Sequence, residues 1–261
     1  MLLLISPAKT LDYDTPTPAR LMGRAQAPRF AAEAAELVSL LRRFSAKQLG
    51  ELMDLSPALA ELNVQRYAAW QPTFGADNSK PALLAFNGDV YEGLDASSLD
   101  EDAFDWAQQH LVMLSGLYGA LRPLDLMQPY RLEMGTRLAN PRGANLYAYW
   151  AGPLADYLNE RLAQDESPVV VNLASQEYFG AVDTRRLKAR VIECAFEDWK
   201  GGRYKVISFF AKRARGLMAR YAAQQQLMSP LALQRFATDG YAFDAAASDP
   251  DRWVFRRRIA D

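Results

Sequence analysis

The sequence is poor in the two side chains that bind transition metals most readily. Its 261 residues contain one cysteine, Cys194, and one histidine, His110. A single cysteine excludes an internal disulfide and is typical of a reducing compartment. Zinc fingers and multi-histidine sites need more of these ligands than the chain has. We therefore predict no bound transition metal and no other cofactor, and we expect His110 to be structural.

Long apolar runs and common catalytic motifs are also missing. No run approaches the roughly 20 apolar residues of a membrane-spanning helix. The start, MLLLISPAKT, lacks the basic and long apolar regions of a signal peptide. There is no Walker phosphate loop, GxSxG, HExxH or GxGxxG. Since half of the residues are hydrophobic and 23% are charged, the composition is that of a globular protein. We expect a cytoplasmic monomer without a membrane partner.

What is present begins with an uneven charge distribution. The net charge is −1, yet residues 81–121 contain seven acids and no Lys or Arg. Residues 205–238 show the reverse, with no acid and six bases: Lys205, Lys212, Arg213, Arg215, Arg220 and Arg235. This segregation predicts a basic surface for an anionic partner. The alternative is that the two segments neutralise each other in the folded protein.

Alternating strand-like and helical patterns predict a single domain of the α/β class, a mixed α+β arrangement with a mixed sheet and flanking helices. We expect buried strands at residues 2–5, 83–86, 111–114 and 169–171, a hairpin of 190–196 with 204–210, and an edge strand at 253–258. We expect helices at residues 30–44, 98–109, 145–164 and 211–226, the second opened by a capping box from Ser98 to Glu101.

Residues 111–135 carry the densest functional pattern. Pro123 and Pro129 fix the backbone of a loop that follows a short apolar run. A stiff, charged loop is more typical of a site than of a simple connection. Its candidate site residues are Ser115, Tyr118, Arg122, Asp125, Tyr130, Arg131 and Glu133. The alternative is that Arg122–Asp125 and Arg131–Glu133 only pair with each other and pin the loop.

Further polar residues follow the other predicted strands. Open α/β sheets bind ligands at the carboxyl ends of their strands. We therefore predict that the strand ends at Ser6, Asn87, Ser115 and Asn172 open on one cleft, with Lys9 and Arg131 on the same face. The remaining polar candidates for this cleft are Thr10, Asp89, Tyr91, Ser175 and Glu177.

Residues 45–70 predict two helices joined by a short turn. Ser45 opens the first with a capping box, and Ser56 with Pro57 opens the second. The turn resembles the helix-hairpin-helix of DNA-binding proteins, in which free amides at the second helix hold a phosphate. Asp54 and Ser56 occupy the two glycine positions of that motif. Because Asp54 adds a negative charge, a purely structural hairpin is the alternative.

The stretch SGLYGALRPLDLMQPYRLEMG within residues 111–135 resembles the YaaA family of bacterial peroxide-stress proteins. Four more stretches share the resemblance, SPAKTLD from Ser6, FNGDVYEGL from Phe86, NLASQEYF from Asn172 and ISFFAKRARGLM from Ile207. Together they extend over essentially the whole chain. The family usually has a lysine where this sequence has Asn87. The resemblance implies a role in hydrogen peroxide stress, where the family limits free intracellular iron.

Three hypotheses for the function remain open. The first is DNA binding through a basic cleft and the hairpin, which would limit iron-driven damage to DNA; too few soft ligands are present for tight iron storage. Its candidate contacts are Lys9, Lys47, Ser56, Arg122, Arg131, Lys212, Arg213 and Arg215, with Gly216 and Ala219 admitting the phosphate backbone. The second is an enzyme acting on a small phosphorylated or nucleotide-like substrate in the same cleft. The third is a scaffold without a ligand.

Overall fold

Three short apolar strands form the centre of the sheet. In the computed structural model, which describes residues 1–258, β1 (Leu2–Ile5) lies between β5 (Leu111–Ser115) and β8 (Val169–Asn172). Every residue in them is buried. The three strands run parallel, with Leu3 opposite both Leu111 and Val171. Parallel strands covered on both faces are apolar throughout, which explains why these runs could be predicted.

The complete sheet has eight strands in the order β11-β12-β9-β8-β1-β5-β6, with β10 paired to β9. Strands β9 (Arg190–Lys200) and β12 (Arg252–Arg257) continue the parallel part. Strands β6 (Gly119–Leu121), β10 (Arg203–Lys205) and β11 (Ala242–Phe243) are antiparallel to their neighbours. The predicted single-domain mixed α/β fold is confirmed. The predicted edge position of 253–258 is wrong, because β11 covers β12.

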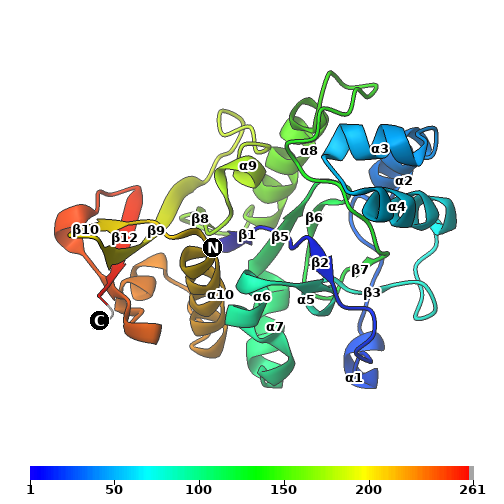
Figure 1. Cartoon of the computed structure of the whole chain (residues 1–261). Coiled ribbons are helices and arrows are strands. Elements are labelled where there is room, and N and C mark those ends of the chain that lie inside the picture. Colours follow the sequence, from blue (N-terminus) through cyan, green and yellow to red (C-terminus); the bar gives the residue numbers. More distant parts are fainter. Residues whose placement is uncertain (259–261) are drawn as a thin grey trace.

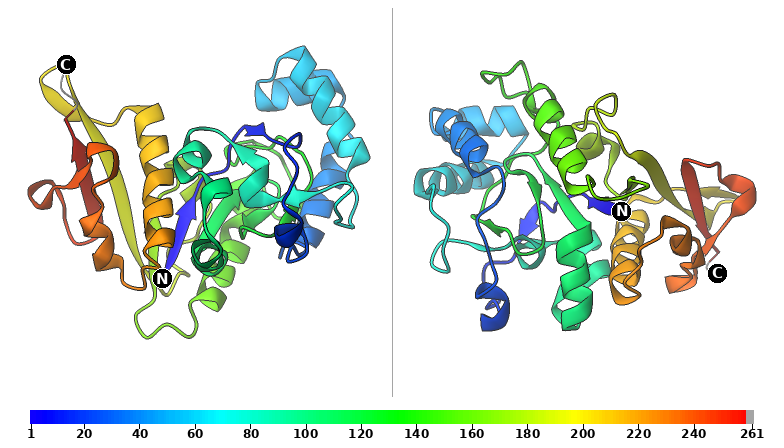
Figure 2. Two further views of the ribbon diagram at one scale, coloured as in Figure 1. Left: turned by 90° about the horizontal axis from the view of Figure 1, so that it is seen from below. Right: turned by 180° about the vertical axis from the view of Figure 1, so that it is seen from behind.

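Helices cover both faces of the sheet (Figure 1). On one side lie α7 (Glu101–His110) and α10 (Ser208–Gln224), and on the other lies α8 (Leu146–Arg161). Three helices, α2 (Ala31–Leu41), α3 (Ala46–Met53) and α4 (Pro57–Ala69), gather at one end of the molecule, opposite β9–β12 (Figures 1 and 2). None of the helices within residues 1–258 is both long and apolar enough to cross a bilayer.

Short elements connect these layers. They are α1 (Ala19–Met22), α5 (Ala82–Ala85), α6 (Asp89–Leu94) and α9 (Gln176–Phe179), the paired strands β2 (Thr10–Leu11) with β4 (Phe86–Asn87), and β3 (Lys80–Pro81) with β7 (Leu126–Met127). Short 3₁₀ helices occupy Ala96–Ser98, Pro230–Arg235, Thr238–Gly240 and Ala245–Ala247. The β2–β4 pair brings Thr10 opposite Asn87, so these two predicted cleft residues are neighbours.

Three local predictions are wrong. The expected strand 83–86 is mostly the helical turn α5, whose Ala and Leu residues are strong helix formers. Ser98 ends a 3₁₀ turn, and Asp100 caps α7 by accepting the Ala103 amide at 2.8 Å. The second strand of the hairpin ends at Lys205, and Ser208 already begins α10. Phe209 and Phe210 gave that segment a strand-like pattern.

The helical hairpin forms where it was predicted. Ser45 and Gln48 make the reciprocal capping box, and the Ser56 hydroxyl accepts the Leu59 amide at 3.4 Å. Between the helices, Asp54 has φ of 52°, in the left-handed region that glycine adopts easily. The turn thus keeps a glycine-like backbone with an aspartate in it.

Helices α6 and α10 cross with their backbones in contact. A Cβ added to Gly216 would lie 1.8 Å from the Val90 carbonyl oxygen, and one added to Gly93 would lie 2.2 Å from that of Arg213. The small residues Gly216 and Ala219 are therefore buried within the fold, and the expectation that they admit a phosphate backbone is wrong.

The basic segment also meets the acidic one at this crossing. Arg220 on α10 donates to the carbonyls of Leu94 and Asp95, each at 2.9 Å, and its guanidinium lies 3.7 Å from the Asp95 carboxylate. Part of the charge segregation is therefore neutralised within the fold's own contacts, and on α10 the bases Lys212 and Arg213 remain exposed.

Candidate functional site

A cavity of about 350 Å³ lies beyond the carboxyl ends of β1 and β8. We call it the strand-end pocket. Its walls come from the segment after β1, the start of α6, the turn α9 and one side of α10. Its polar lining consists of Ser6, Lys9, Thr10, Asn87, Asp89, Tyr91, Ser175, Glu177, Tyr178, Lys212 and Arg215. Of the four strand ends predicted to open on one cleft, those at Ser6 and Asn87 line this pocket, Asn172 is represented by the loop that follows it, and Ser115 does not line it.

Hydrogen bonds fix the side of the pocket formed by Ser6. Its hydroxyl accepts the Ser175 amide at 2.8 Å and lies 3.3 Å from the Ser175 hydroxyl. The Tyr91 hydroxyl donates to the Ser6 carbonyl at 3.1 Å. Burial raises the pKa of Tyr91 and of Tyr178 well above the ordinary tyrosine value. Both phenols are therefore neutral hydrogen-bonding groups at physiological pH.

Lys9 and Arg131 meet at the carboxylate of Glu133. The Lys9 ammonium lies 2.8 Å from one oxygen, and the Arg131 guanidinium donates to the other at 2.9 Å. Burial alone would raise the pKa of Glu133, but these two cations lower it below its ordinary value. A small hollow lined by Lys9, Arg131 and Glu133 adjoins the strand-end pocket. Two bases therefore share the carboxylate of Glu133 at the pocket's rim.

Arg215 enters the strand-end pocket from α10 and is largely enclosed by protein. Its Nε atom is buried without a hydrogen-bond partner. Among the residues that the structure describes, its guanidinium forms no ion pair, since Glu193 influences it only at longer range. Burial lowers the pKa of Arg215, but an arginine remains charged in proteins. The pocket thus contains a partly buried cation whose charge is offset only by the longer-range attraction of Glu193.

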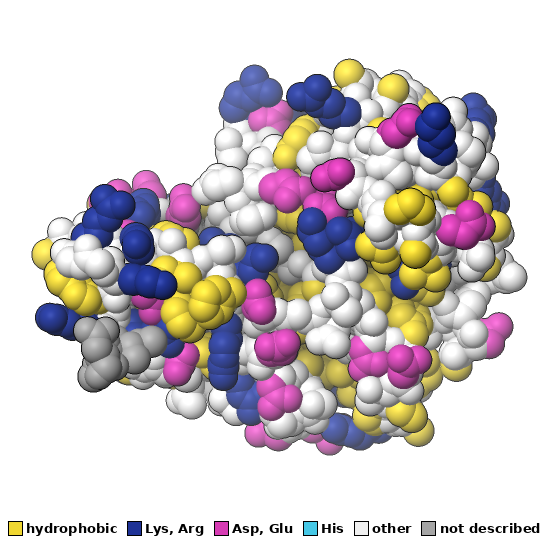
Figure 3. Space-filling view, in the orientation of Figure 1, with side chains coloured by type: hydrophobic (Ala, Val, Ile, Leu, Met, Phe, Trp, Pro, Cys, Tyr) yellow, Lys and Arg dark blue, Asp and Glu magenta, His cyan; other side chains and the backbone are white. Residues whose placement is uncertain are grey.

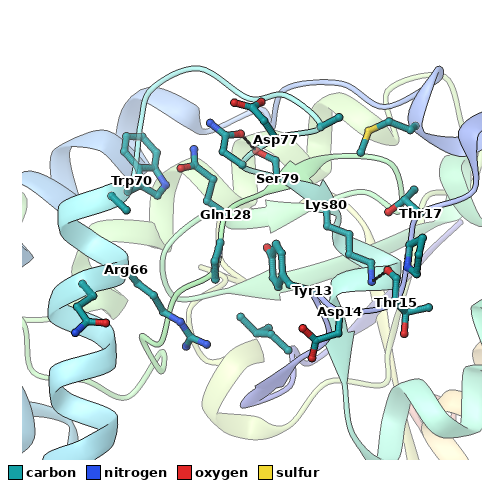
Figure 4. A pocket seen from close by; sticks show the side chains of 18 of the residues that line it. Tyr13, Asp14, Thr15, Thr17, Arg66, Trp70, Asp77, Ser79, Lys80 and Gln128 are labelled. Atoms are coloured by element: carbon teal, nitrogen blue, oxygen red, sulfur yellow. Dashed lines mark hydrogen bonds between the residues drawn. The ribbon is translucent and has the colours of Figure 1, made fainter.

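A second and larger cleft, of about 1020 Å³, lies beside α4 and is shown in Figure 4. We call it the α4 cleft. Arg66 extends from α4 into it on the side of Tyr13, whereas Trp70 and Gln128 lie farther along the wall. Burial lowers the pKa of Arg66, and the nearby charge of Arg131 lowers it further. Sequence analysis missed Arg66; its only signal was a base within the hairpin's second helix.

Lys80 also borders the α4 cleft, but its charge is used within the fold. Its ammonium donates to the Thr15 carbonyl at 2.8 Å and lies 3.6 Å from the Asp12 carboxylate. Arg66, by contrast, has no ion pair within residues 1–258. Each of the two clefts therefore holds an arginine without an ion pair among residues 1–258, and the charge of Arg131, beside the strand-end pocket, acts on Arg66.

Arg122 and Asp125 lie away from the strand-end pocket, which corrects the prediction. Strand β6 runs back along β5, so that Ser115 faces Gly119 and Met113 faces Leu121. Arg122 thus emerges at the amino end of β5. There it lies 3.1 Å from Asp125, whose buried carboxylate also accepts from the Gln26 side chain at 3.1 Å. This pair has the structural role that was considered as the alternative.

Four other predicted cleft residues are buried in the interior instead of lining the strand-end pocket. The Ser115 and Tyr130 hydroxyls lie 2.6 Å apart, the Tyr118 hydroxyl accepts from the Trp70 indole at 2.9 Å, and Asn172 accepts the Ala174 amide at 2.9 Å. Tyr130 alone reaches the small hollow beside Lys9. These polar groups hold the loops in place.

The remaining predicted bases do not form one surface with the pocket. Lys47 on α3 is exposed beside Glu51, and Ser56 caps α4; both belong to the end of the molecule remote from α10 (Figures 1 and 2). Arg213 is exposed on α10 outside the pocket lining. Figure 3 shows Lys and Arg in separate groups on this face, many beside Asp or Glu. A continuous basic track is thus not the arrangement here.

His110 lies outside both clefts. Its Nδ1 donates to the Met1 carbonyl at 2.8 Å, and its ring stacks on Trp106. Burial lowers its pKa. This is a structural position. Within residues 1–258, no three His, Cys, Asp or Glu side chains are grouped so that they could hold a metal ion.

Comparison with known proteins decides the family. The family model described as "Peroxide stress protein YaaA" matches residues 1–247. The chain belongs to the YaaA family. A UPF0246 protein of Paracidovorax citrulli is 64% identical over 260 residues, which is all of both chains. UPF0246 proteins of Bordetella petrii and Methylibium petroleiphilum are each 61% identical over 99% of this chain and all of their own. Membership of the YaaA family supports a role in peroxide stress.

Proposed function

We propose that this protein acts in peroxide stress by binding DNA at the edge of the sheet that carries the strand-end pocket. The observation that carries the proposal is the meeting of Lys9, Lys212 and Arg215 in one pocket. These bases come from two segments about two hundred residues apart. Arg131 adjoins the pocket, and its charge influences Arg66 in the α4 cleft. Cations on a shaped surface are suited to a phosphate backbone.

We relate the family's role in iron to DNA: the protein would protect DNA from iron-driven damage. A chain with one His and one Cys has too few soft ligands to store iron tightly. DNA is a target of iron-driven oxidation, so a protein bound along it would limit the damage without holding the metal.

The helical hairpin is proposed as a secondary contact. Asp54 has the left-handed backbone that the DNA-binding motif normally assigns to glycine. Amides at the start of α4 could bind a phosphate, although the Ser56 hydroxyl already accepts one of them. The carboxylate of Asp54 opposes an anion at this position. We therefore expect the hairpin to contribute less than the strand-end pocket.

A salt titration tests the proposal. Each phosphate neutralised on duplex DNA contributes a slope of about −0.9 to log K against log salt, so four contacts give about −3.6. Reversing the charges of Lys212 and Arg213 together should flatten this slope and weaken binding to all sequences alike. The matched control reverses Arg185 and Lys188, two exposed bases outside the pocket. Equal losses in both double variants would refute the assigned surface.

A substitution that should raise the affinity for DNA provides a second test, because a gain of binding cannot result from unfolding. Asn87 lines the pocket opposite Thr10 and is exposed. Asn87→Lys adds a cation there and should tighten DNA binding several-fold, with a steeper salt slope. Weaker or unchanged binding would count against the pocket as the phosphate site.

The alternative is an enzyme acting on a small phosphorylated or nucleotide-like substrate. The strand-end pocket favours it, because the carboxylates of Asp89 and Glu177 lie in the same cavity as Lys212 and Arg215. Carboxylates beside cations are suited to acid–base chemistry on a bound phosphate. Turnover of a nucleotide that is lost in Asp89→Asn or Glu177→Gln, with DNA binding absent, would establish this alternative over DNA binding.

A further inference from the structure

The isolated charge of Arg215 calls for an anion from outside the chain. A buried charge is costly unless it is paired and hydrogen-bonded. Its Nε atom is buried with no hydrogen-bond partner among residues 1–258, so a ligand can meet only the terminal Nη atoms of the guanidinium. The other bases in the pocket, Lys9 and Lys212, carry the same sign of charge. Arg215 forms no ion pair with residues 1–258, so only the longer-range attraction of Glu193 offsets the free-energy cost of burying its charge.

The nearby carboxylates compensate the charge of Arg215 only from beyond ion-pairing distance. Glu177 accepts the Gly135 amide at 3.0 Å, and Glu193 accepts from the Gln176 side chain at 3.2 Å. Asp89 lines the pocket at the start of α6. None of the three comes within ion-pairing distance of Arg215. These carboxylates repel a ligand anion in proportion to its charge, so a phosphate binds only where the attraction of Lys9, Lys212 and Arg215 exceeds that repulsion.

The shape of the pocket narrows the choice of anion. Its volume of about 350 Å³ lies near the lower end of the roughly 300–1,000 Å³ found for small-molecule sites. An internal phosphodiester needs room for the chain to leave on both sides. A terminal phosphate enters end-on, carries a charge of about −1.5 to −2 at pH 7, and offers three oxygens. An arginine fork binds two of these oxygens at once.

We propose that the strand-end pocket binds a terminal phosphate, a phosphomonoester at the end of a nucleic acid strand or on a free mononucleotide. Arg215 grips two phosphate oxygens, Lys212 and Lys9 add charge, and the Ser175 hydroxyl is available at the side formed by Ser6. The inference rests on the proposed function in taking the ligand to be nucleotidic. It goes further by making the strand end the recognised feature.

Matched oligonucleotides test this directly on the wild-type protein. The probes are one short single-stranded sequence with a 5′-phosphate, a 3′-phosphate or hydroxyls at both ends. Deoxyadenosine monophosphate is compared with deoxyadenosine in parallel. We expect a terminal phosphate to tighten oligonucleotide binding by about 10-fold or more, as for hydrogen bonds to a charged group. Equal affinity for phosphorylated and hydroxyl-ended probes overturns the inference, even if DNA itself binds.

Two variants on the same helix assign the effect. Arg215→Gln should abolish the preference for the terminal phosphate. Arg213→Gln, at an exposed position outside the pocket, should weaken binding of phosphorylated and hydroxyl-ended probes alike and so retain the preference. A preference that survives in a folded Arg215→Gln protein refutes the role of Arg215. If that variant fails to fold, the wild-type comparison still decides the inference.

The two probe families separate this inference from the DNA proposal. Preference for phosphorylated oligonucleotides supports both. Binding of the mononucleotide over the nucleoside, with no binding of any oligonucleotide, supports the phosphate pocket and overturns DNA binding. Salt-dependent binding of oligonucleotides with equal affinity for phosphorylated and hydroxyl ends supports the DNA proposal and overturns the terminal-phosphate site. Absence of binding to every probe refutes both.

Discussion

Two acid–base pairs from one loop have opposite environments. Asp125 is fully buried and pairs with Arg122, whereas Glu133 is 23% exposed and pairs with Lys9 and Arg131. Burial outweighs the hydrogen bonds at Asp125 and raises the pKa of its carboxyl, whereas the two cations lower that of Glu133. The same pairing of residue types thus serves the interior in one case and borders a pocket in the other.

The comparison teaches that the environment of a pair, and not its composition, decides its role. Asp125 has every partner it needs from Arg122 and Gln26. Glu133 is shared by two bases, so its charge is exceeded by theirs. A ligand anion has nothing to gain near Arg122 and something to gain near Lys9.

The largest expected effect is on stability at Asp125. Asp125→Ala removes three hydrogen bonds and leaves Arg122 and Gln26 without their buried acceptor. We expect the free energy of unfolding to fall by about 3 kcal/mol, measured by urea denaturation. DNA affinity of the folded protein should not change. A loss of affinity at constant fold would remove the distinction between the two pairs.

The second largest effect is expected on the affinity for a phosphorylated oligonucleotide when Glu133 is substituted. Glu133→Gln frees Lys9 and Arg131 from their shared carboxylate, so affinity for a phosphorylated oligonucleotide should rise several-fold, equivalent to about 1 kcal/mol. Stability should change by less than about 1 kcal/mol, because the group is partly exposed. Fluorescence anisotropy and urea denaturation measure the two quantities. If Glu133→Gln lowered the free energy of unfolding as much as Asp125→Ala, Glu133 would be a structural residue as well.

The pH dependence of stability should differ in sign between the pairs. Glu133 has a lowered pKa in the folded state, so its contribution is present above its ordinary value of 4.5 and is lost as the pH falls through the folded pKa. Asp125 has a raised pKa, so its contribution is fullest below its ordinary value of 3.8 and declines as the pH rises through the folded pKa. Unfolding free energies of Glu133→Gln and Asp125→Asn, measured from pH 3 to 7 against wild type, should diverge in opposite directions. Parallel profiles would contradict the assignment.

The smallest effect is expected for a fully exposed pair. Lys47 lies 4.0 Å from Glu51 on the same helix, with 87% of its side chain exposed. Such pairs contribute about 0.3–0.5 kcal/mol, so Lys47→Ala should barely change the unfolding free energy. A DNA-binding loss in this variant larger than that of the Lys212 and Arg213 double reversal would make the hairpin the main contact.

Much of this fold could be predicted because local rules decide it. Continuous apolar runs gave β1, β5 and β8, and the serines at positions 45 and 56 gave the hairpin's caps. The prediction of a strand at 83–86 is wrong because its Ala and Leu residues permit either a strand or a helical turn, and the pairing of β4 decides between them.

The site was only partly predictable because it depends on what lies opposite each residue. Lys9 and Glu177 could be placed at strand ends by position alone. Arg122 could not, since its location depends on the sharp reversal at Gly119, where φ is +64°. Within residues 1–258, the lack of an ion-pair partner at Arg215 and Arg66 depends on which residues surround them in the fold, and no spacing in the sequence encodes it.

The glycine crossing of α6 and α10 has a consequence for ligand recognition. Both helices wall the strand-end pocket, and they touch through main-chain atoms at Gly93 and Gly216. Main-chain contacts have no rotamers to rearrange, so the distance between these two walls is set once, when the chain folds. A ligand then meets walls whose conformational entropy has already been lost, which favours tight binding of one size over adaptable binding of many. By fixing the spacing of α6 and α10, Gly93 and Gly216 limit the size of the molecule that the pocket can bind.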